Sequence, residues 1–160
     1  MENVNLKQAM FGAGCFWGVQ YSFDQIKGVV ESEVGYAGGH SANPTYKSVC
    51  TDTTGHAEVV HLWYDSEIVS YRELLKVFWE NHDPTTMNRQ GPDIGSQYRS
   101  VVFYYDSEQK ELAEKSKEEL AKSGKYSNPI VTEIIPAGQF YKAEDYHQKY
   151  FIKTGQKVCH

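Results

Sequence analysis

The sequence lacks the features of several large classes of protein. No apolar run approaches the roughly 20 residues that a helix needs to cross a bilayer. Residues 1–8 are polar and contain no apolar core followed by a small-residue cleavage site, so we expect no signal peptide and a cytoplasmic location. The 16 basic residues form no cluster among the 21 acidic ones. We therefore expect neither a membrane nor a nucleic acid as partner.

Cysteine is scarce, and its pattern excludes a disulfide framework. The three cysteines, Cys15, Cys50 and Cys159, are an odd number and include no CxxC pair. A zinc site made of Cys50, His56, Cys159 and His160 is an alternative, but this spacing matches no compact zinc motif. We therefore expect no metal and no cofactor, which leaves the cysteines available for thiol chemistry.

The composition is otherwise that of a globular chain, with many tyrosines. Of the 160 residues, 40% are hydrophobic and 23% are charged, both ordinary values. A chain of this length buries roughly 70% of its unfolded surface, enough for one core. We expect a single domain over residues 1–160, with a C-terminal tail from about 140 to 160. The 12 tyrosines suit either core packing or a surface that binds a partly polar ligand.

Hydrophobic periodicity predicts alternating strands and helices. Ser70 and Glu73 have the spacing of a capping box at the start of one helix. The order of elements matches a split β-α-β arrangement, so we expect an α+β fold, a ferredoxin-like sandwich with long irregular loops and an extended C-terminal tail. The predicted strands are 9–11, 29–36, 58–64, 100–105 and 130–135, the helices 15–27, 70–79 and 107–123, and the irregular segments 37–55 and 82–97.

The most informative local feature is Cys15, placed between a predicted strand and a predicted helix. Gly14 and Gly18 flank it, and Phe16 and Trp17 follow it directly. The first turn of a helix stabilises negative charge, so a cysteine there favours the thiolate, which is the nucleophilic form. The alternative is a small buried residue at a tight turn, the commoner role of a lone cysteine.

Two further segments carry polar residues next to predicted strands. Glu58 begins a strand among apolar neighbours, where burial raises the pKa of a carboxyl and makes it a candidate general acid. The alternative is a solvated strand residue. The second segment, 82–100, combines aspartate, arginine, glutamine and tyrosine in a long loop, which is typical of a binding surface.

Four motifs together give the sequence a close resemblance to a known family. They are GCFWG at 14–18, TGHAE at 54–58, HDPTT at 82–86 and RQGPDIGSQYRS at 89–100. In this order they resemble the A-type peptide methionine sulfoxide reductases, and the resemblance extends from about Phe11 to Gln148. It implies a thiol-dependent enzyme that reduces the S epimer of methionine sulfoxide, free or in proteins.

The resemblance also implies a role for each site residue. Cys15 would be the nucleophile that takes the oxygen and becomes a sulfenic acid, and Glu58 would protonate that oxygen. Five side chains would bind the substrate, the first two around its methyl group and the last three on its polar side: Phe16, Trp17, Tyr46, Asp93 and Tyr98.

The second half of the reaction is where the sequence departs from the family. Cys159 is the positional candidate for the thiol that resolves the sulfenic acid, with a thioredoxin-like dithiol protein as reductant. Its local sequence is Lys-Val-Cys, however, and not the Gly-Tyr-Cys that the resemblance leads us to expect. Cys50 and an external thiol are the alternatives. Asp52 stands where relatives often have glycine. The unusual tail favours an alternative function, a module that binds oxidised methionine with poor turnover.

Overall fold

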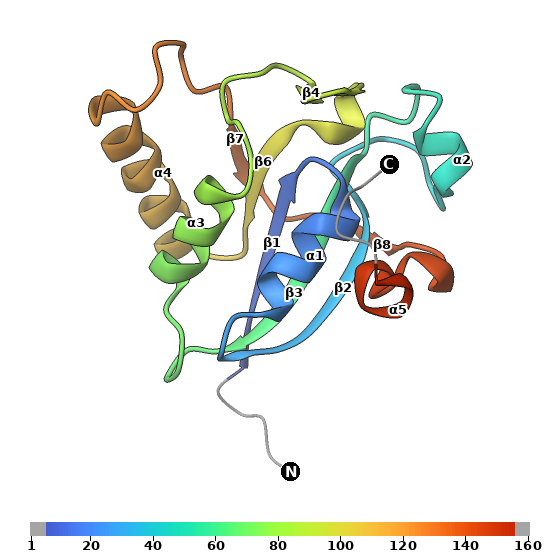
Figure 1. Cartoon of the computed structure of the whole chain (residues 1–160), viewed down its shortest axis with the longest axis horizontal. Coiled ribbons are helices and arrows are strands. Elements are labelled where there is room, and N and C mark those ends of the chain that lie inside the picture. The colour runs from blue at the N-terminus through green and yellow to red at the C-terminus, as the bar shows by residue number, and fades with distance from the viewer. Residues whose placement is uncertain (1–5, 156–160) are drawn as a thin grey trace.

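The computed structural model describes residues 6–155, which form a mixed α/β fold built on one twisted sheet (Figure 1). The main sheet has six strands in the order β7-β6-β1-β3-β2-β8. All neighbouring pairs are antiparallel except β6 and β7. Its strands are β1 (Leu6–Ala13), β2 (Val29–Ala37), β3 (Ala57–Asp65), β6 (Ser100–Tyr104), β7 (Glu133–Pro136) and β8 (Phe140–Lys142).

The helices and a small hairpin complete the described chain. None of the helices within 6–155 has the length and apolar character needed to cross a membrane. The helices are α1 (Phe16–Asp24), α2 (Tyr46–Val49), α3 (Tyr71–Glu80), α4 (Ser107–Lys122) and α5 (Tyr150–Thr154), with 3-10 turns η1 (Ser96–Tyr98) and η2 (Asp145–His147); the hairpin is β4 (Arg89–Gln90) and β5 (Asp93–Ile94).

Alternation along the strands divides the core between the two faces of the sheet. Phe11 of β1 packs among side chains of α1 and α3, while its neighbour Met10 packs on the opposite face. Figure 1 shows α1 and α3 lying over the same face of the sheet. The opposite face is covered in part by Ala137, from the connection between β7 and β8, and by Phe140, the first residue of β8. The prediction of helices combined with a sheet is confirmed.

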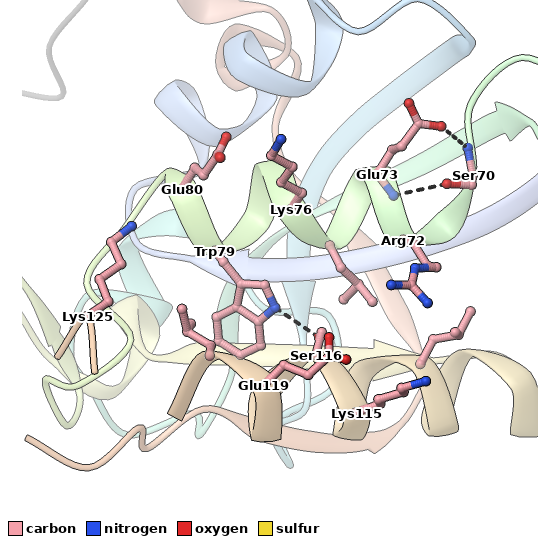
Figure 2. A pocket seen from close by; sticks show the side chains of 13 residues that line it. Ser70, Arg72, Glu73, Lys76, Trp79, Glu80, Lys115, Ser116, Glu119 and Lys125 are labelled. Carbon is pink, nitrogen blue, oxygen red and sulfur yellow. Dashed lines mark hydrogen bonds between the residues drawn. The ribbon is translucent and has the colours of Figure 1, made fainter. Parts of the chain in front are cut away.

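The start of α3 follows its local sequence. The Ser70 hydroxyl accepts from the Glu73 N–H at 3.1 Å, and the Glu73 carboxylate accepts from the Ser70 N–H at 2.9 Å (Figure 2). The predicted capping box is therefore confirmed. Near the other end of α3, the Trp79 indole donates to Ser116 of α4 at 3.0 Å. A groove of about 590 Å³ with charged side chains along its rim lies between these two helices (Figure 2).

The predicted strand 130–135 is wrong at its start. The strand is Glu133–Pro136, parallel to β6, and begins where Glu133 pairs with Val101. Before this strand, the Val131 N–H donates to the Pro84 carbonyl at 2.8 Å, so it cannot also pair with β6. The two segments predicted to be irregular also contain short elements: α2 in 37–55, and the β4–β5 hairpin and η1 in 82–97.

The segment from 140 onward is not the extended tail that the sequence predicted. Over the described residues 140–155 it returns to the sheet as β8, which pairs with β2 through Tyr36 and Tyr141, and continues as η2 and α5. Ala143, His147 and Phe151 are buried. These buried positions are four residues apart, and the charged residues between them obscure this spacing in the sequence.

Replacing Gly35 tests how β8 is held against β2. A Cβ at Gly35 would lie 2.2 Å from the Tyr141 carbonyl oxygen, so Gly35→Ala must push β8 away. We expect the free energy of unfolding in urea to fall by about 1–3 kcal/mol. Gly138→Ala is the control, because a Cβ there meets nothing within 4 Å, and it should change stability by less than about 0.5 kcal/mol. Equal stability of the two variants would contradict the steric argument.

Candidate active site

Cys15 lies at the junction of β1 and α1, as the sequence predicted. Gly14 has a φ of 96° and makes the turn out of β1, and Cys15 is the N-cap residue of α1. The Cys15 carbonyl accepts the Val19 N–H at 3.3 Å, which begins the helix. The side chain is half-buried. Cys15 is disulfide-bonded in the structure. When it is reduced, its sulfur lies beside the positive end of the helix dipole, where a negative charge is stabilised.

Glu58 is buried beside this helix terminus. Strand alternation places it on the same face as Val60, which pairs with Phe11 of β1. The side chain is only 2% exposed, and Oε1 accepts the Phe16 N–H at 3.2 Å. Oε2 has no hydrogen-bond partner among the described residues. The solvated-strand alternative is therefore wrong.

Burial controls the protonation of Glu58. Removal from water raises its pKa to about 8; the Phe16 N–H lowers the pKa in part, and the charge of Asp93 adds to the increase. The carboxyl therefore holds a proton at neutral pH in the folded protein. Because Oε2 is unpartnered within the described chain, that proton is available for donation to a bound molecule.

Two tyrosines from separate loops face the same carboxyl. Tyr46 is the first residue of α2, and its N–H donates to Glu144 Oε2 at 3.0 Å. Tyr98 is the last residue of η1. Burial is the main cause that raises the pKa of both phenols, and Glu58, which is ionised at the alkaline pH where a phenol loses its proton, raises both further. Both hydroxyls therefore stay protonated and can donate hydrogen bonds.

An aromatic wall borders the site on the side of α1. The Trp17 ring stacks on Tyr150 at a centroid distance of 4.0 Å, and its indole N–H donates to His147 Nδ1 at 2.9 Å. The Phe16 ring lies 5.2 Å from the ring of His147 and 6.4 Å from that of Tyr46. The wall therefore combines residues from α1, α2, η2 and α5.

Three residues of this site were missed in the sequence. Tyr36 is opposite Glu58 in the β2–β3 ladder, and its hydroxyl donates to Glu144 Oε1 at 2.9 Å. Glu144 thus holds both Tyr36 and the start of α2. His147 is fully buried, and burial lowers its pKa. The spacing of His147 from Ala143 and Phe151 was the signal that these residues belong to the fold.

The structure brings together most of the site residues predicted from the sequence, and it places the alternatives. Cys159 lies outside the described residues. Cys50 is the C-cap residue of α2 and is exposed, and partial removal of its thiol from water is the main cause of a raised pKa. His56 is unsuited to bind zinc, because Nδ1 accepts the Gly39 N–H and Nε2 bonds to the Ser41 carbonyl. The predicted residues that gather around Glu58 and the start of α1 are Cys15, Phe16, Trp17, Tyr46, Asp93 and Tyr98.

A cysteine at a helix start, close to a protonated carboxyl and two protonated phenols, is an arrangement that suits the redox chemistry of an oxidoreductase. The sequence model of the family described as peptide methionine sulfoxide reductase matches residues 7–160, and the chain belongs to this family. It is thus an oxidoreductase that reduces methionine sulfoxide.

Individual relatives cover nearly the whole chain. The peptide methionine sulfoxide reductase MsrA of Methanosarcina acetivorans is 61% identical over 94% of this chain and 80% of its own length. Among solved structures, reduced Mxr1 from Saccharomyces cerevisiae superposes with a TM-score of 0.91 at 36% identity, covering 99% of this chain and 91% of its own. Mxr1 in complex with Trx2 gives a TM-score of 0.65 at 27% identity, covering 93% and 87%.

The raised pKa of Glu58 predicts a specific dependence of stability on pH. The pKa is about 8 in the folded protein against an ordinary value of 4.5, so the folded state holds an extra proton between these values. The free energy of unfolding therefore falls as pH rises through this window, by roughly 5 kcal/mol at most. Glu58→Gln cannot titrate, so its stability relative to the parent should increase from pH 5 to pH 8 in urea titrations. A constant difference would mean that Glu58 titrates normally.

Proposed function

We propose that this chain reduces the S epimer of methionine sulfoxide with Cys15 as nucleophile and Glu58 as proton donor. The observation that carries the proposal is the buried carboxyl, held in its protonated form next to the helix that begins at Cys15. A sulfoxide oxygen is a strong hydrogen-bond acceptor but a poor leaving group, so its departure needs a proton. A site with a thiolate but no acid would reduce the substrate far more slowly.

In the first step the Cys15 thiolate attacks the sulfoxide sulfur. The S–O bond breaks as Glu58 supplies a proton to the oxygen, and the oxygen passes to the cysteine. Methionine leaves with its sulfur reduced by two electrons, and Cys15 is oxidised to the sulfenic acid. Tyr46 and Tyr98 donate hydrogen bonds to the oxygen, and Asp93 keeps the proton on Glu58 through its charge.

The aromatic wall supports selection of one epimer. Phe16 and Trp17 offer an apolar surface for the methyl group, while the phenols and the carboxyl face the oxygen. When the methyl group and the oxygen are held on different sides of the site, the positions of the lone pair and of the rest of the substrate are fixed as well. Only one configuration at sulfur fits this arrangement. The resemblance to the family assigns this configuration as S.

In the second step a thiol condenses with the sulfenic acid, which gives a disulfide and water. We assign this thiol to Cys159. Cys50 is the weaker candidate because the raised pKa of its thiol reduces its thiolate fraction. A dithiol protein of the thioredoxin type then reduces the disulfide, an assignment supported by the complex of yeast Mxr1 with Trx2.

The architecture proposed from the sequence fits this function. The order β6-β1-β3-β2, antiparallel throughout and with α1 and α3 as the connections that cross one face, supports a ferredoxin-like split β-α-β core. We propose that residues 1–160 form one catalytic domain, since segments from both ends of the described chain meet at the site. A catalyst that depends on free thiols suits the cytoplasm, where reducing systems maintain them.

The separated sulfoxide epimers test the first step. With a thioredoxin system as reductant, we expect repeated methionine formation from the S epimer alone, and no turnover by Cys15→Ser. Glu58→Gln should slow the first step about 10²- to 10⁴-fold, because the proton donor is lost. In the parent the rate should decline as pH rises above about 8, where Glu58 ionises. Full activity of Cys15→Ser would overturn the proposal.

The two remaining cysteines can be separated by their effect on turnover. Cys159→Ser should form one methionine per enzyme and then stop with thioredoxin, while Cys50→Ser should turn over repeatedly. The measurement is methionine formed per enzyme, with and without excess reductant. If the parent itself stops at one equivalent, the chain acts as the binding module considered as the alternative function. If Cys50→Ser stops and Cys159→Ser does not, Cys50 is the resolving thiol.

A further inference from the structure

The two phenols of the proposed site come from separate loops and need a common frame. Tyr46 begins α2, and Tyr98 ends η1. Neither of these short elements belongs to the main sheet. Two donors can address one oxygen only if the loops that carry them hold a fixed distance and orientation.

One side chain joins these loops directly. Asp52 follows α2, and its Oδ1 accepts hydrogen bonds from the Ser96 backbone N–H, at 3.2 Å, and from the Ser96 hydroxyl. Ser96 is the first residue of η1, so its N–H has no partner within that turn. Asp52 therefore caps η1 from 44 residues away in the sequence. The carboxylate makes both bonds charge-assisted, which strengthens them.

The backbone of Asp52 adds a second observation. Its φ is 60°, in the left-handed region that glycine adopts freely and that other residues rarely adopt. An aspartate is less stable than glycine in this backbone conformation. Such positions persist where the surrounding structure uses the side chain, and here the use is the bond to Ser96.

The residues next to this contact interact with the phenols themselves. Gln97, directly after Ser96, is 4% exposed and interacts with both the Tyr98 hydroxyl and the Cys50 thiol. Cys50 in turn interacts with the Tyr46 hydroxyl. A shift of Asp52 relative to Ser96 is therefore transmitted to both phenols over one or two residues.

We propose that Asp52 is a positioning residue, which caps η1 and thereby fixes Tyr98 relative to Tyr46 so that both hydroxyls reach the sulfoxide oxygen. Asp52 itself does not touch the substrate. The inference rests on the proposed roles of the two tyrosines, so its test needs one readout of the chemistry and one of the contact alone.

The rate of the first step is the chemical readout. Asp52→Gly removes the side chain that caps η1 and leaves a residue that adopts the same backbone conformation freely. We expect the rate of methionine formation at saturating S-sulfoxide, without reductant, to fall about tenfold. Asp52→Asn keeps an acceptor oxygen and should stay within about twofold of the parent. The decline in rate near pH 8 should not move, because Asp52 does not contribute to the raised pKa of Glu58.

Two further variants control for the backbone and for the partner. Asn43→Gly releases another left-handed residue of the same loop, with a φ of 51°, and should leave the rate unchanged. Combining Ser96→Ala with Asp52→Gly should slow the reaction no more than Asp52→Gly alone, because the two side chains act through one contact. Additive effects, or a rate for Asp52→Gly within twofold of the parent, would overturn the proposal.

Hydrogen exchange of backbone amides is the readout of the contact alone. Asp52→Gly should speed exchange in both 46–52 and 93–98, whereas Asn43→Gly should leave 93–98 unchanged. If the parent forms no methionine, the proposed function fails, and the exchange data still test the contact between Asp52 and Ser96. If exchange speeds up in Asp52→Gly while its first step keeps the parent rate, the loops are joined but Asp52 does not position the phenols, and the proposal is wrong.

Discussion

The site depends on the burial of one carboxyl against the start of one helix. Glu58 accepts the Phe16 N–H while its other oxygen has no partner in the described chain, and the surrounding apolar side chains exclude water. Two effects oppose each other there. The helix terminus favours the carboxylate, and desolvation favours the acid, which is the larger effect. One helix start therefore lies beside two functional groups, the sulfur of Cys15 and a carboxyl that is kept protonated.

This balance explains why the neighbouring residues are so closely packed. Any water admitted beside Glu58 would lower its pKa and remove the proton at neutral pH. Phe16 closes one side, and Tyr36, opposite Glu58 in the ladder, is itself fully buried. The Tyr36 hydroxyl is held by Glu144, which also anchors the start of α2. The fold thus excludes water with groups that at the same time locate the phenol of Tyr46.

Local sequence was sufficient for some features and insufficient for others. The capping box of Ser70 and Glu73 and the position of Cys15 at the helix start depend on neighbours within a few residues, so they could be predicted. The roles proposed for Tyr46, Asp93 and Tyr98 came from the family resemblance. The bond from Trp17 to His147 joins residues 130 apart, and no local pattern encodes it. The strand Phe140–Lys142 was missed for the same reason, because its pairing with β2 is decided by tertiary contacts.

The return of the segment after residue 140 to the sheet has a consequence for synthesis of the protein. Trp17 stacks on Tyr150, so the aromatic wall cannot close until nearly the whole described chain has left the ribosome. At roughly 5–20 residues per second, Cys15 emerges on the order of ten seconds before that partner. During this interval the nascent chain carries an open thiol whose apolar neighbours are still exposed to water. A newly made molecule therefore passes through a period in which the apolar side chains around Cys15 are exposed and prone to aggregation.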